Sequence, residues 1–453
     1  MELSEDTFNR LSLGIIEKQK CTPEEAIQKL ESLKIYLVCG DKIKESLPLQ
    51  AAVITAVNTG KRAFLGGVYI RMPENTPCLL PWTPTNTFNN AIQETGGILT
   101  ESVPNDCFKI MFGLSNDNED NSIQVVCNNW QAGIITEIIN APFDEIGTNP
   151  TAGIFAGGLA ICLSFLKLSG INISSCDKSV GVSLWRPDIY WLDENAKGPQ
   201  VTLLPKKFWL LGLGHLGQAY LWNIGLLPFK NTNEIHLLLQ DYDRIVEANV
   251  SAGLLCYKED SGIFKTRKCS RWLEARGFNT KTTERKFDEN TKRIDEEPFV
   301  ALCGFDSALS RLNLENAGFD LVVETSLGNN LATFDNIILH TFPNASKLPK
   351  DIWGDMDETK QEINHTVHDI LKEKDNEICG IIPLSIAGKA MSGSFVGACS
   401  GALVIAEILR GLNGGIRYDK IVVQLRVVDD IKAVQYSKGF YTTELSKNGF
   451  VVN

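Results

Sequence analysis

The hydrophobic pattern of the first part of the chain alternates short apolar runs with longer stretches of helical length. The short runs span residues 35–39 and 66–70, and the longer ones span 49–59 and 153–168. Strands that alternate with helices are typical of βαβ units and of a parallel sheet. The pattern therefore predicts an α/β lobe over residues 1–195, in which we find no nucleotide-binding motif.

The same alternation resumes after a polar stretch at residues 193–200, which is the best candidate for a linker between two lobes. The second lobe is predicted to span residues 201–453. Within it, residues from about 343–380 are polar and interrupted by prolines, which favours a long crossover loop. A helix rich in Gly, Ala and Ser is predicted at 393–409, because small side chains allow close packing on a neighbouring element.

A Gly-rich turn follows the first apolar run of the second lobe. Gly212 would permit the tight turn, Gly214 the approach of phosphate oxygens, and Gly217 the packing of the next helix on the strand. The next apolar run, 235–239, is soon followed by Asp241, whose carboxylate would accept hydrogen bonds from ribose hydroxyls. This order of strand, turn, helix, strand and acid predicts a nucleotide site at the N-terminus of the helix.

Charge and composition exclude several classes of partner. The chain has 453 residues and a formal net charge of -11, whereas a nucleic-acid binder needs a basic face. No apolar run reaches the roughly 20 residues that cross a bilayer, and the N-terminus is acidic where a secretory signal is basic. We therefore expect a cytoplasmic protein that binds neither nucleic acid nor membrane.

The 12 cysteines are scattered singly, and no pair has the two-residue spacing of a zinc knuckle. A disulfide framework is not expected in a cytoplasmic chain of this size. Cys162, Cys303 and Cys399 lie within apolar runs and are predicted to be buried.

Residues downstream of the Gly-rich turn extend the pattern well beyond a dinucleotide motif. They are Asp241 and Asp243 after the second strand, then Asn249, then Gly262 with Lys265, and finally Asp306 with Arg311. At this spacing the chain resembles the ubiquitin-activating enzyme superfamily, whose simplest members are ThiF and MoeB, over about residues 208–410. The resemblance implies a Rossmann-like, ThiF-type adenylation domain, preceded by a second α/β lobe that would be a degenerate copy of it.

The resemblance also implies ATP and Mg²⁺ as cofactors. Lys265 would contact the outgoing phosphates and Asp306 would bind the metal, because attack on the α-phosphorus of ATP builds up negative charge. Asp241 and Asp243 would bind the nucleotide, the former through its ribose, and Asn249 would lie near the ribose or the phosphates. Taken singly, a loop Lys is usually solvated and an Asp after a strand often caps a helix. The assignment therefore depends on the shared spacing.

The sequence departs from the family pattern at one cation. Ala252 stands where the family usually has an Arg, so a guanidinium is missing beside Lys265 and Arg311, which the resemblance implies are catalytic. In two-lobed members of the family an inactive lobe lends an Arg across the interface. The candidates for a replacement are therefore Lys258 and Lys268 nearby, and Arg62 and Arg71 of the first lobe.

A cysteine nucleophile is the second question that the resemblance raises. Ubiquitin-activating members pass the adenylated C-terminus to a cysteine, which in compact members lies on the crossover loop. Cys379, at the end of the predicted crossover, is the candidate catalytic nucleophile. Its acidic neighbours would raise the pKa of its thiol unless one of the nearby lysines comes close. Cys256 and Cys269, which are flanked by Lys or Arg, are the runners-up.

The function implied is ATP-dependent activation of a ubiquitin-like protein, followed by thioester formation and transfer to a conjugating enzyme. The length and the lack of zinc cysteines resemble the activating enzymes of bacterial ubiquitin-like conjugation operons, antiviral ones included. Two other interpretations stay open: an adenylyltransferase for sulfur transfer or peptide modification, and a non-catalytic scaffold. An NAD-dependent dehydrogenase would suit the Gly-rich turn but gives Lys265 and Asp306 no role. The chain would form a homodimer or, within itself, a pseudo-dimer.

Overall fold

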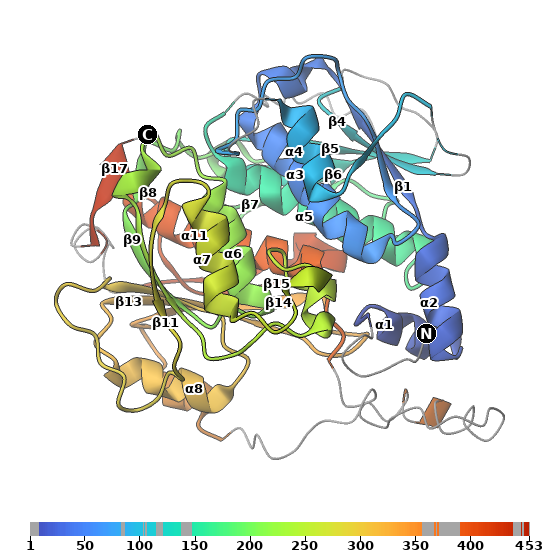
Figure 1. Ribbon diagram of the computed structural model, residues 1–453. Coiled ribbons are helices and arrows are strands. Elements are labelled where there is room, and N and C mark those ends of the chain that lie inside the picture. The colour runs from blue at the N-terminus through green and yellow to red at the C-terminus, as the bar shows by residue number, and fades with distance from the viewer. Residues whose placement is uncertain are drawn as a thin grey trace.

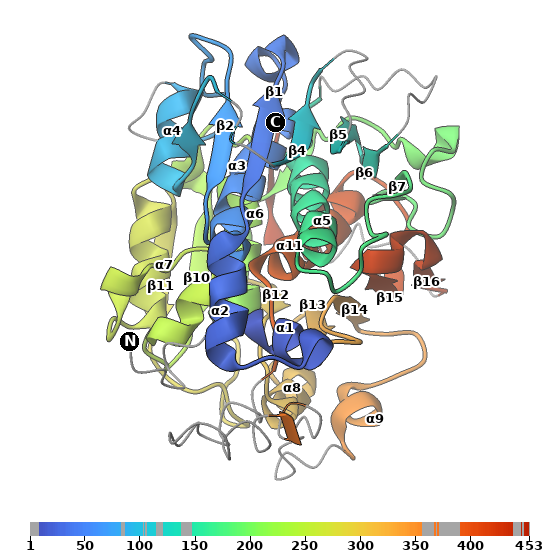
Figure 2. The same ribbon diagram turned by 90° about the vertical axis from the view of Figure 1, so that its right-hand side faces the viewer.

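The computed structural model describes residues 9–82, 87–102, 104, 107–114, 121–136, 147–355, 367, 369–370, 390–437, 445 and 448–452. These residues form two large sheets with helices packed between and around them (Figures 1 and 2). The helices are α1 (Ser12–Gln19), α2 (Pro23–Ser32), α3 (Leu47–Ala63), α4 (Phe88–Thr95), α5 (Pro150–Leu168), α6 (His215–Gly225), α7 (Lys265–Glu274), α8 (Ala308–Leu312), α9 (Pro349–Trp353) and α11 (Ser394–Leu412).

The first sheet has seven strands in the order β3-β2-β1-β4-β5-β6-β7. The strands from β3 to β5 are parallel, and the pairs β5-β6 and β6-β7 are antiparallel. Their bounds are β1 (Ile35–Cys39), β2 (Val68–Arg71), β3 (Ile98–Leu99), β4 (Phe108–Phe112), β5 (Ser122–Asn128), β6 (Gln131–Ile135) and β7 (Val180–Ser183).

The second sheet has eight strands in the order β11-β10-β9-β12-β13-β14-β15-β16. It is parallel from β11 to β13 and antiparallel from β13 to β16. Its strands are β9 (Lys207–Leu211), β10 (His236–Gln240), β11 (Asn279–Thr283), β12 (Val300–Cys303), β13 (Leu321–Leu327), β14 (Asn336–Phe342), β15 (Tyr418–Gln424) and β16 (Lys432–Gln435). A separate pair joins β8 (Leu203–Pro205) to β17 (Phe450–Val452).

The two sheets share one topology over their first seven positions. In each, the first strand of the sheet pairs with the second and fourth, and the sixth and seventh strands are antiparallel to the strands before them. Parallel strands in the order 3-2-1-4-5, linked by helices, are the arrangement of a Rossmann-like fold. The α/β class and the parallel sheets predicted from the apolar runs are thus confirmed.

Four long helices join the two sheets (Figure 1). Helices α3 and α5 follow strands of the first sheet, α6 and α11 belong to the second, and α11 packs on both α5 and α6. Hydrogen bonds cross between the halves, for example from Trp222 Nε1 to Thr55 Oγ1 at 2.9 Å and from Asn58 Nδ2 to Leu254 O at 3.1 Å. One hydrophobic core therefore runs through both halves.

Small residues bring these helices together as the sequence predicted. All residues of α11 are buried. An added Cβ at Gly401 would lie 2.6 Å from Ala219 O, so the two backbones approach too closely for any side chain there. On α5, a Cβ at Gly157 would lie 2.3 Å from Ala52 O of α3. Replacement of these glycines would push the helices apart.

Helices α5 and α11 are also long and apolar enough to cross a membrane. The most apolar stretches of these helices, however, are 89% and 100% buried inside the protein. Burial of this extent is typical of the core helices of soluble proteins.

The segment predicted as a linker is packed on the first half rather than extended between the halves. Asn129 Nδ2 donates to the carbonyls of Gly198 and Pro199 at 2.7 and 2.8 Å, and Trp130 Nε1 donates to Pro199 O at 2.7 Å. The predicted domain boundaries at 1–195 and 201–453 stay predictions. The polar composition of this segment suggested a linker, but the segment is packed on the protein and is not a free tether.

The predicted crossover is described at residues 343–355 and at 367 and 369–370. After β14, Asn344 Nδ2 donates to Asp419 O at 3.1 Å and the backbone N–H of Ala345 donates to Asp419 Oδ2 at 3.1 Å. The short helix α9 then places Trp353 in the core. Cys379 lies outside the described residues, so its role stays a prediction.

Candidate nucleotide site

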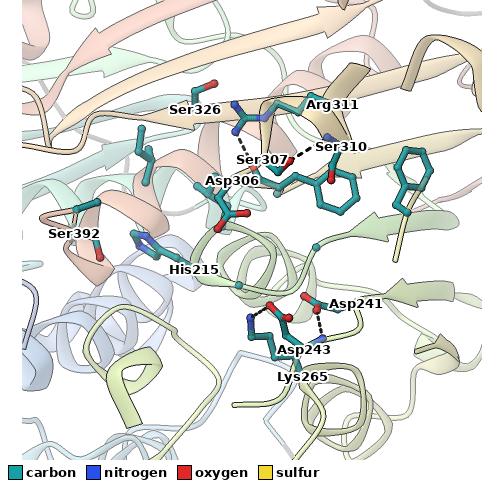
Figure 3. Close-up of a pocket in the computed structure, with 18 of the residues that line it drawn as sticks. His215, Asp241, Asp243, Lys265, Asp306, Ser307, Ser310, Arg311, Ser326 and Ser392 are labelled. Carbon is teal, nitrogen blue, oxygen red and sulfur yellow. Dashed lines mark hydrogen bonds and ion pairs between the residues drawn. The ribbon is translucent and has the colours of Figure 1, made fainter. Parts of the chain in front are cut away.

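A cavity of about 670 Å³ opens at the carboxyl ends of β9, β10 and β12 (Figure 3). In open α/β sheets, ligands bind at this edge, where the order of strands reverses. Its polar lining residues include Gly212, Gly214, Asp241, Asp243, Lys265, Asp306 and Arg311, together with Arg10, His215, Arg285, Lys286 and Ser326. Most of the residues that the sequence analysis selected thus lie around a single hollow.

The Gly-rich turn has the geometry that its spacing predicted. Gly212 has a φ of +80°, and its N–H donates to Gln240 O at 2.9 Å. A Cβ at Gly217 would lie 1.9 Å from Gly212 O, whereas a Cβ at Gly214 would meet nothing within 4 Å. Gly217 therefore packs the start of α6 on the turn and does not line the cavity, while Gly214 leaves open space beside the N-terminus of α6. A helix N-terminus next to open space suits phosphate oxygens.

Two carboxylates and a lysine form one side of the cavity (Figure 3). Asp241 Oδ2 accepts a hydrogen bond from Leu213 N at 2.6 Å, so this carboxylate also holds the Gly-rich turn. Lys265 Nζ lies 2.7 Å from Asp243 Oδ2. Burial favours the neutral amine of Lys265, but the nearby carboxylates of Asp241 and Asp243 outweigh it and raise the pKa of Lys265. The lysine is therefore a fixed cation at neutral pH.

Asp306 and Arg311 lie on the opposite side of the cavity (Figure 3). The side chain of Asp306 is exposed on the turn that follows β12. The residues present suit a hydrated Mg²⁺, which usually takes one or two carboxylates and completes its shell with water and phosphate oxygens. Arg311 is 7% exposed, and its Nη2 donates to Phe305 O at 2.5 Å.

Asn249 does not line the cavity. Its side-chain Oδ1 accepts a hydrogen bond from Val246 N at 3.0 Å and so supports the 3₁₀ turn Glu247–Ser251. The predicted contact of Asn249 with the ribose or phosphates stays a prediction.

The residues predicted to replace the missing arginine do not line this cavity. Arg62 is 4% exposed and is held by the carbonyls of Val250 and Cys256, at 2.9 and 3.2 Å, across the junction of the two halves. Arg71 lines a separate hollow at the end of the first sheet. Lys258 pairs with Glu247, Lys268 pairs with Asp260, and neither lysine lines the cavity.

Arg10 lines the cavity although it belongs to the first half of the chain. It precedes α1, and Asn9 Nδ2 donates to Arg62 O at 3.1 Å, which ties this segment to α3. Gly14 of α1 packs on Met391, another cavity residue, since a Cβ at Gly14 would overlap the Met391 thioether. Arg10 was not predicted from the sequence because no local pattern around it indicates its neighbours.

The two alternative nucleophiles are buried. Cys256 and Cys269 have no exposed surface, and burial raises the pKa of both thiols. Of the cysteines in the described part of the chain, Cys21 and Cys78 are half-buried and the others are buried. A buried thiol of raised pKa is a poor nucleophile, so these findings weigh against Cys256 and Cys269.

Comparisons with known proteins cover nearly the whole chain. A family model described as the BilD N-terminal domain matches residues 34–184, and one described as the BilD C-terminal domain matches residues 204–415. The bacterial E1-like protein BilD of Collimonas sp. (strain OK412) is 32% identical over an alignment of 451 residues that covers 97% of this chain and 97% of that protein.

Among solved structures, that of MccB from E. coli is similar at 16% identity, with a TM-score of 0.34 over 52% of this chain and 64% of that chain. A structure of the same protein with ATP is similar at 14% identity, with a TM-score of 0.33 over 52% of this chain and 65% of that chain.

Proposed function

Because the chain belongs to the BilD family of bacterial E1-like proteins, we propose that it uses ATP and Mg²⁺ to activate the C-terminal carboxylate of a ubiquitin-like protein. The observation that carries this proposal is the cavity that brings Gly214, Lys265 and Asp306 together. Open backbone beside a helix N-terminus, a fixed cation and an exposed carboxylate are three groups that ATP with Mg²⁺ requires.

The proposed reaction is an acyl adenylation. A carboxylate oxygen of the ubiquitin-like C-terminus forms a bond to the α-phosphorus of ATP, the bond from that phosphorus to the bridging oxygen breaks, and pyrophosphate leaves. Bound Mg²⁺ would neutralise charge on the phosphates. Lys265 would stabilise the charge that moves onto the pyrophosphate, and Asp306 would hold the metal.

In the second proposed step, a cysteine thiolate attacks the acyl carbon, forms a thioester and releases AMP. Cys379 is the proposed nucleophile, and a conjugating enzyme would then accept the acyl group. The burial of Cys256 and Cys269 supports the choice of Cys379 over them. The enzyme would work in the cytoplasm of a bacterium, in a ubiquitin-like conjugation system such as an antiviral one.

We further propose that the first half is a degenerate adenylation-like lobe and that the chain is a pseudo-dimer within itself. The shared strand order of the two sheets supports this. At the position that corresponds to the Gly-rich turn, β1 is followed by Gly40 and the 3₁₀ turn Asp41–Lys44. Gly40, Asp41 and Lys42 line the separate hollow of the first half, and this turn has one glycine where the turn of the second half has Gly212, Gly214 and Gly217.

In this arrangement Arg10 of the first half supplies the cation missing at Ala252. Arg10→Ala is expected to lower kcat/KM for ATP by about 10- to 100-fold, because a charge-assisted contact to phosphate is lost. Pyrophosphate exchange at varied ATP concentrations measures the effect. Arg71→Ala, at the end of the first sheet, is the matched control and should behave as the wild type. An unchanged Arg10→Ala enzyme would show that another group neutralises the phosphates.

The proposal as a whole is tested by incubating the chain with ATP, Mg²⁺ and a candidate ubiquitin-like protein. We expect ATP–pyrophosphate exchange that depends on the partner's C-terminal residue. We also expect an adduct band on the non-reducing gel that disappears when the sample is reduced. Exchange without a reducible adduct would favour the sulfur-transfer or peptide-modifying alternative. The absence of exchange, with tight binding of NAD in place of ATP, would overturn the proposal.

A further inference from the structure

A buried ion cluster lies behind the wall of the cavity. Glu324 on β13 and His340 on β14 are direct cross-strand partners, and they are 0% and 6% exposed. Glu324 Oε1 lies 2.6 Å from His340 Nδ1. A buried carboxylate is costly unless hydrogen bonds or opposite charges compensate it. This pair was not predicted from the sequence, although an acid within the apolar run Leu321–Leu327 is itself an unusual signal.

The carboxylate of Glu324 also interacts with two side chains that line the cavity. Glu324 Oε2 lies 3.6 Å from Arg311 Nε and accepts a hydrogen bond from Ser326 Oγ at 3.5 Å. Arg311 and Ser326 both belong to the cavity lining (Figure 3). Glu324 therefore connects a histidine in the sheet with the surface that would face the nucleotide.

Arg311 in turn fixes the backbone that carries Asp306. Its Nη2 donates to Phe305 O at 2.5 Å and to Thr325 O at 3.4 Å. Phe305 directly precedes Asp306, so the guanidinium holds one end of the turn on which the proposed metal ligand sits. With these contacts directed into the protein, Arg311 is suited to hold the turn rather than to touch phosphate.

Trp353 of α9 covers this cluster from the crossover side. The guanidinium of Arg311 lies 5.5 Å from the centre of the Trp353 ring. The ring of His340 lies 5.9 Å from that of Trp353, nearly perpendicular to it. Because Trp353 is 2% exposed, the cluster is shielded from water, which strengthens its electrostatic interactions.

We infer that Glu324 and His340 are positioning residues for the adenylation reaction: through Arg311 they hold the Phe305–Asp306 turn where Asp306 can bind Mg²⁺. This inference depends on the proposed function, and it names the residues that hold the proposed metal ligand in place. Neither Glu324 nor His340 lines the cavity, so both act through Arg311. A displacement of about 1 Å at a reacting centre can cost about 100-fold in rate.

The test is the Mg²⁺ dependence of two measurements on the full chain: ATP binding followed by calorimetry, and ATP–pyrophosphate exchange with the ubiquitin-like substrate. His340→Leu and Glu324→Gln are expected to raise the Mg²⁺ concentration for half-maximal exchange about tenfold and to lower the maximal rate by roughly 10- to 100-fold. His340→Asn keeps an N–H near the position of Nδ1 and should restore most of the Mg²⁺ affinity. His236→Leu, at an exposed position of β10, is the matched control.

A merely structural role would give a different result. Partial unfolding lowers the maximal rate in proportion to the folded fraction but leaves the Mg²⁺ midpoint unchanged, and thermal unfolding measures that fraction. A wild-type midpoint in both His340→Leu and Glu324→Gln would overturn the inference. Should His340→Leu fail to fold, the midpoint of Glu324→Gln decides alone. If the wild type exchanges no pyrophosphate with any substrate, the proposed function fails and this inference fails with it.

Discussion

Replacing Asp306 by asparagine is expected to lower ATP–pyrophosphate exchange by about 10³-fold. The substitution keeps the shape of the side chain but removes the charge that would hold Mg²⁺, whose stabilisation of phosphoryl charge amounts to several kcal/mol. Asp306 is exposed at the cavity, so the change should leave the fold intact. Radiolabelled pyrophosphate exchange with saturating ubiquitin-like substrate measures the loss.

The matched control for Asp306→Asn is Asp295→Asn, since the side chain of Asp295 is 97% exposed and lies outside the cavity lining. It should exchange pyrophosphate as the wild type does. Mn²⁺, which binds less strictly to oxygen ligands, should restore part of the activity of Asp306→Asn if the loss is one of metal binding. Full exchange by Asp306→Asn in Mg²⁺ would show that the metal is held by other residues.

Replacing Cys379 by alanine is expected to abolish the reducible adduct with the ubiquitin-like protein and to leave pyrophosphate exchange within about twofold of the wild type. Adenylation needs no thiol, whereas the thioester cannot form without one. Non-reducing gels of the reaction, run beside reducing ones, measure the adduct, and exchange measured on the same preparation reports the first step. The two steps are thereby separated in one enzyme.

The control for Cys379→Ala is substitution of the two half-buried cysteines of the described chain, as Cys21→Ala and Cys78→Ala. Both variants should still form the adduct. An adduct that persists in Cys379→Ala and disappears in one of these would move the nucleophile to that position. If all three variants form it, either a different thiol carries the adduct or more than one thiol can, and the assignment of Cys379 as the single nucleophile is wrong.

The Gly-rich turn at the cavity was predictable from the sequence because its requirements are local. A strand, three glycines at fixed spacing and an acid after the next strand determine the turn by steric contacts over a few residues. The overlap that a Cβ at Gly217 would have with Gly212 O is the clearest case. The parallel sheets followed for the same reason, since short apolar runs between helices have few other ways to bury both faces.

Contacts between distant segments were not predictable in this way. Arg10 lines the cavity only because α1 packs near Met391, and Glu324 meets His340 only through the register of β13 and β14. The polar stretch around Gly198 is anchored by its backbone carbonyls, which composition does not describe. These pairings depend on how the whole chain folds, and no local sequence motif indicates them.

The pairing of α5 with α11 has a consequence for how the protein evolves and works. In a symmetric dimer of identical subunits each substitution appears twice, so a change that suits one side of the interface must also suit the other. Here both halves lie on one polypeptide, and each can diverge without its counterpart. The covalent link also keeps Arg10 at a high effective concentration beside the cavity of the same molecule. Dilution in the cell therefore does not separate the cavity from the half that contributes Arg10 to its lining.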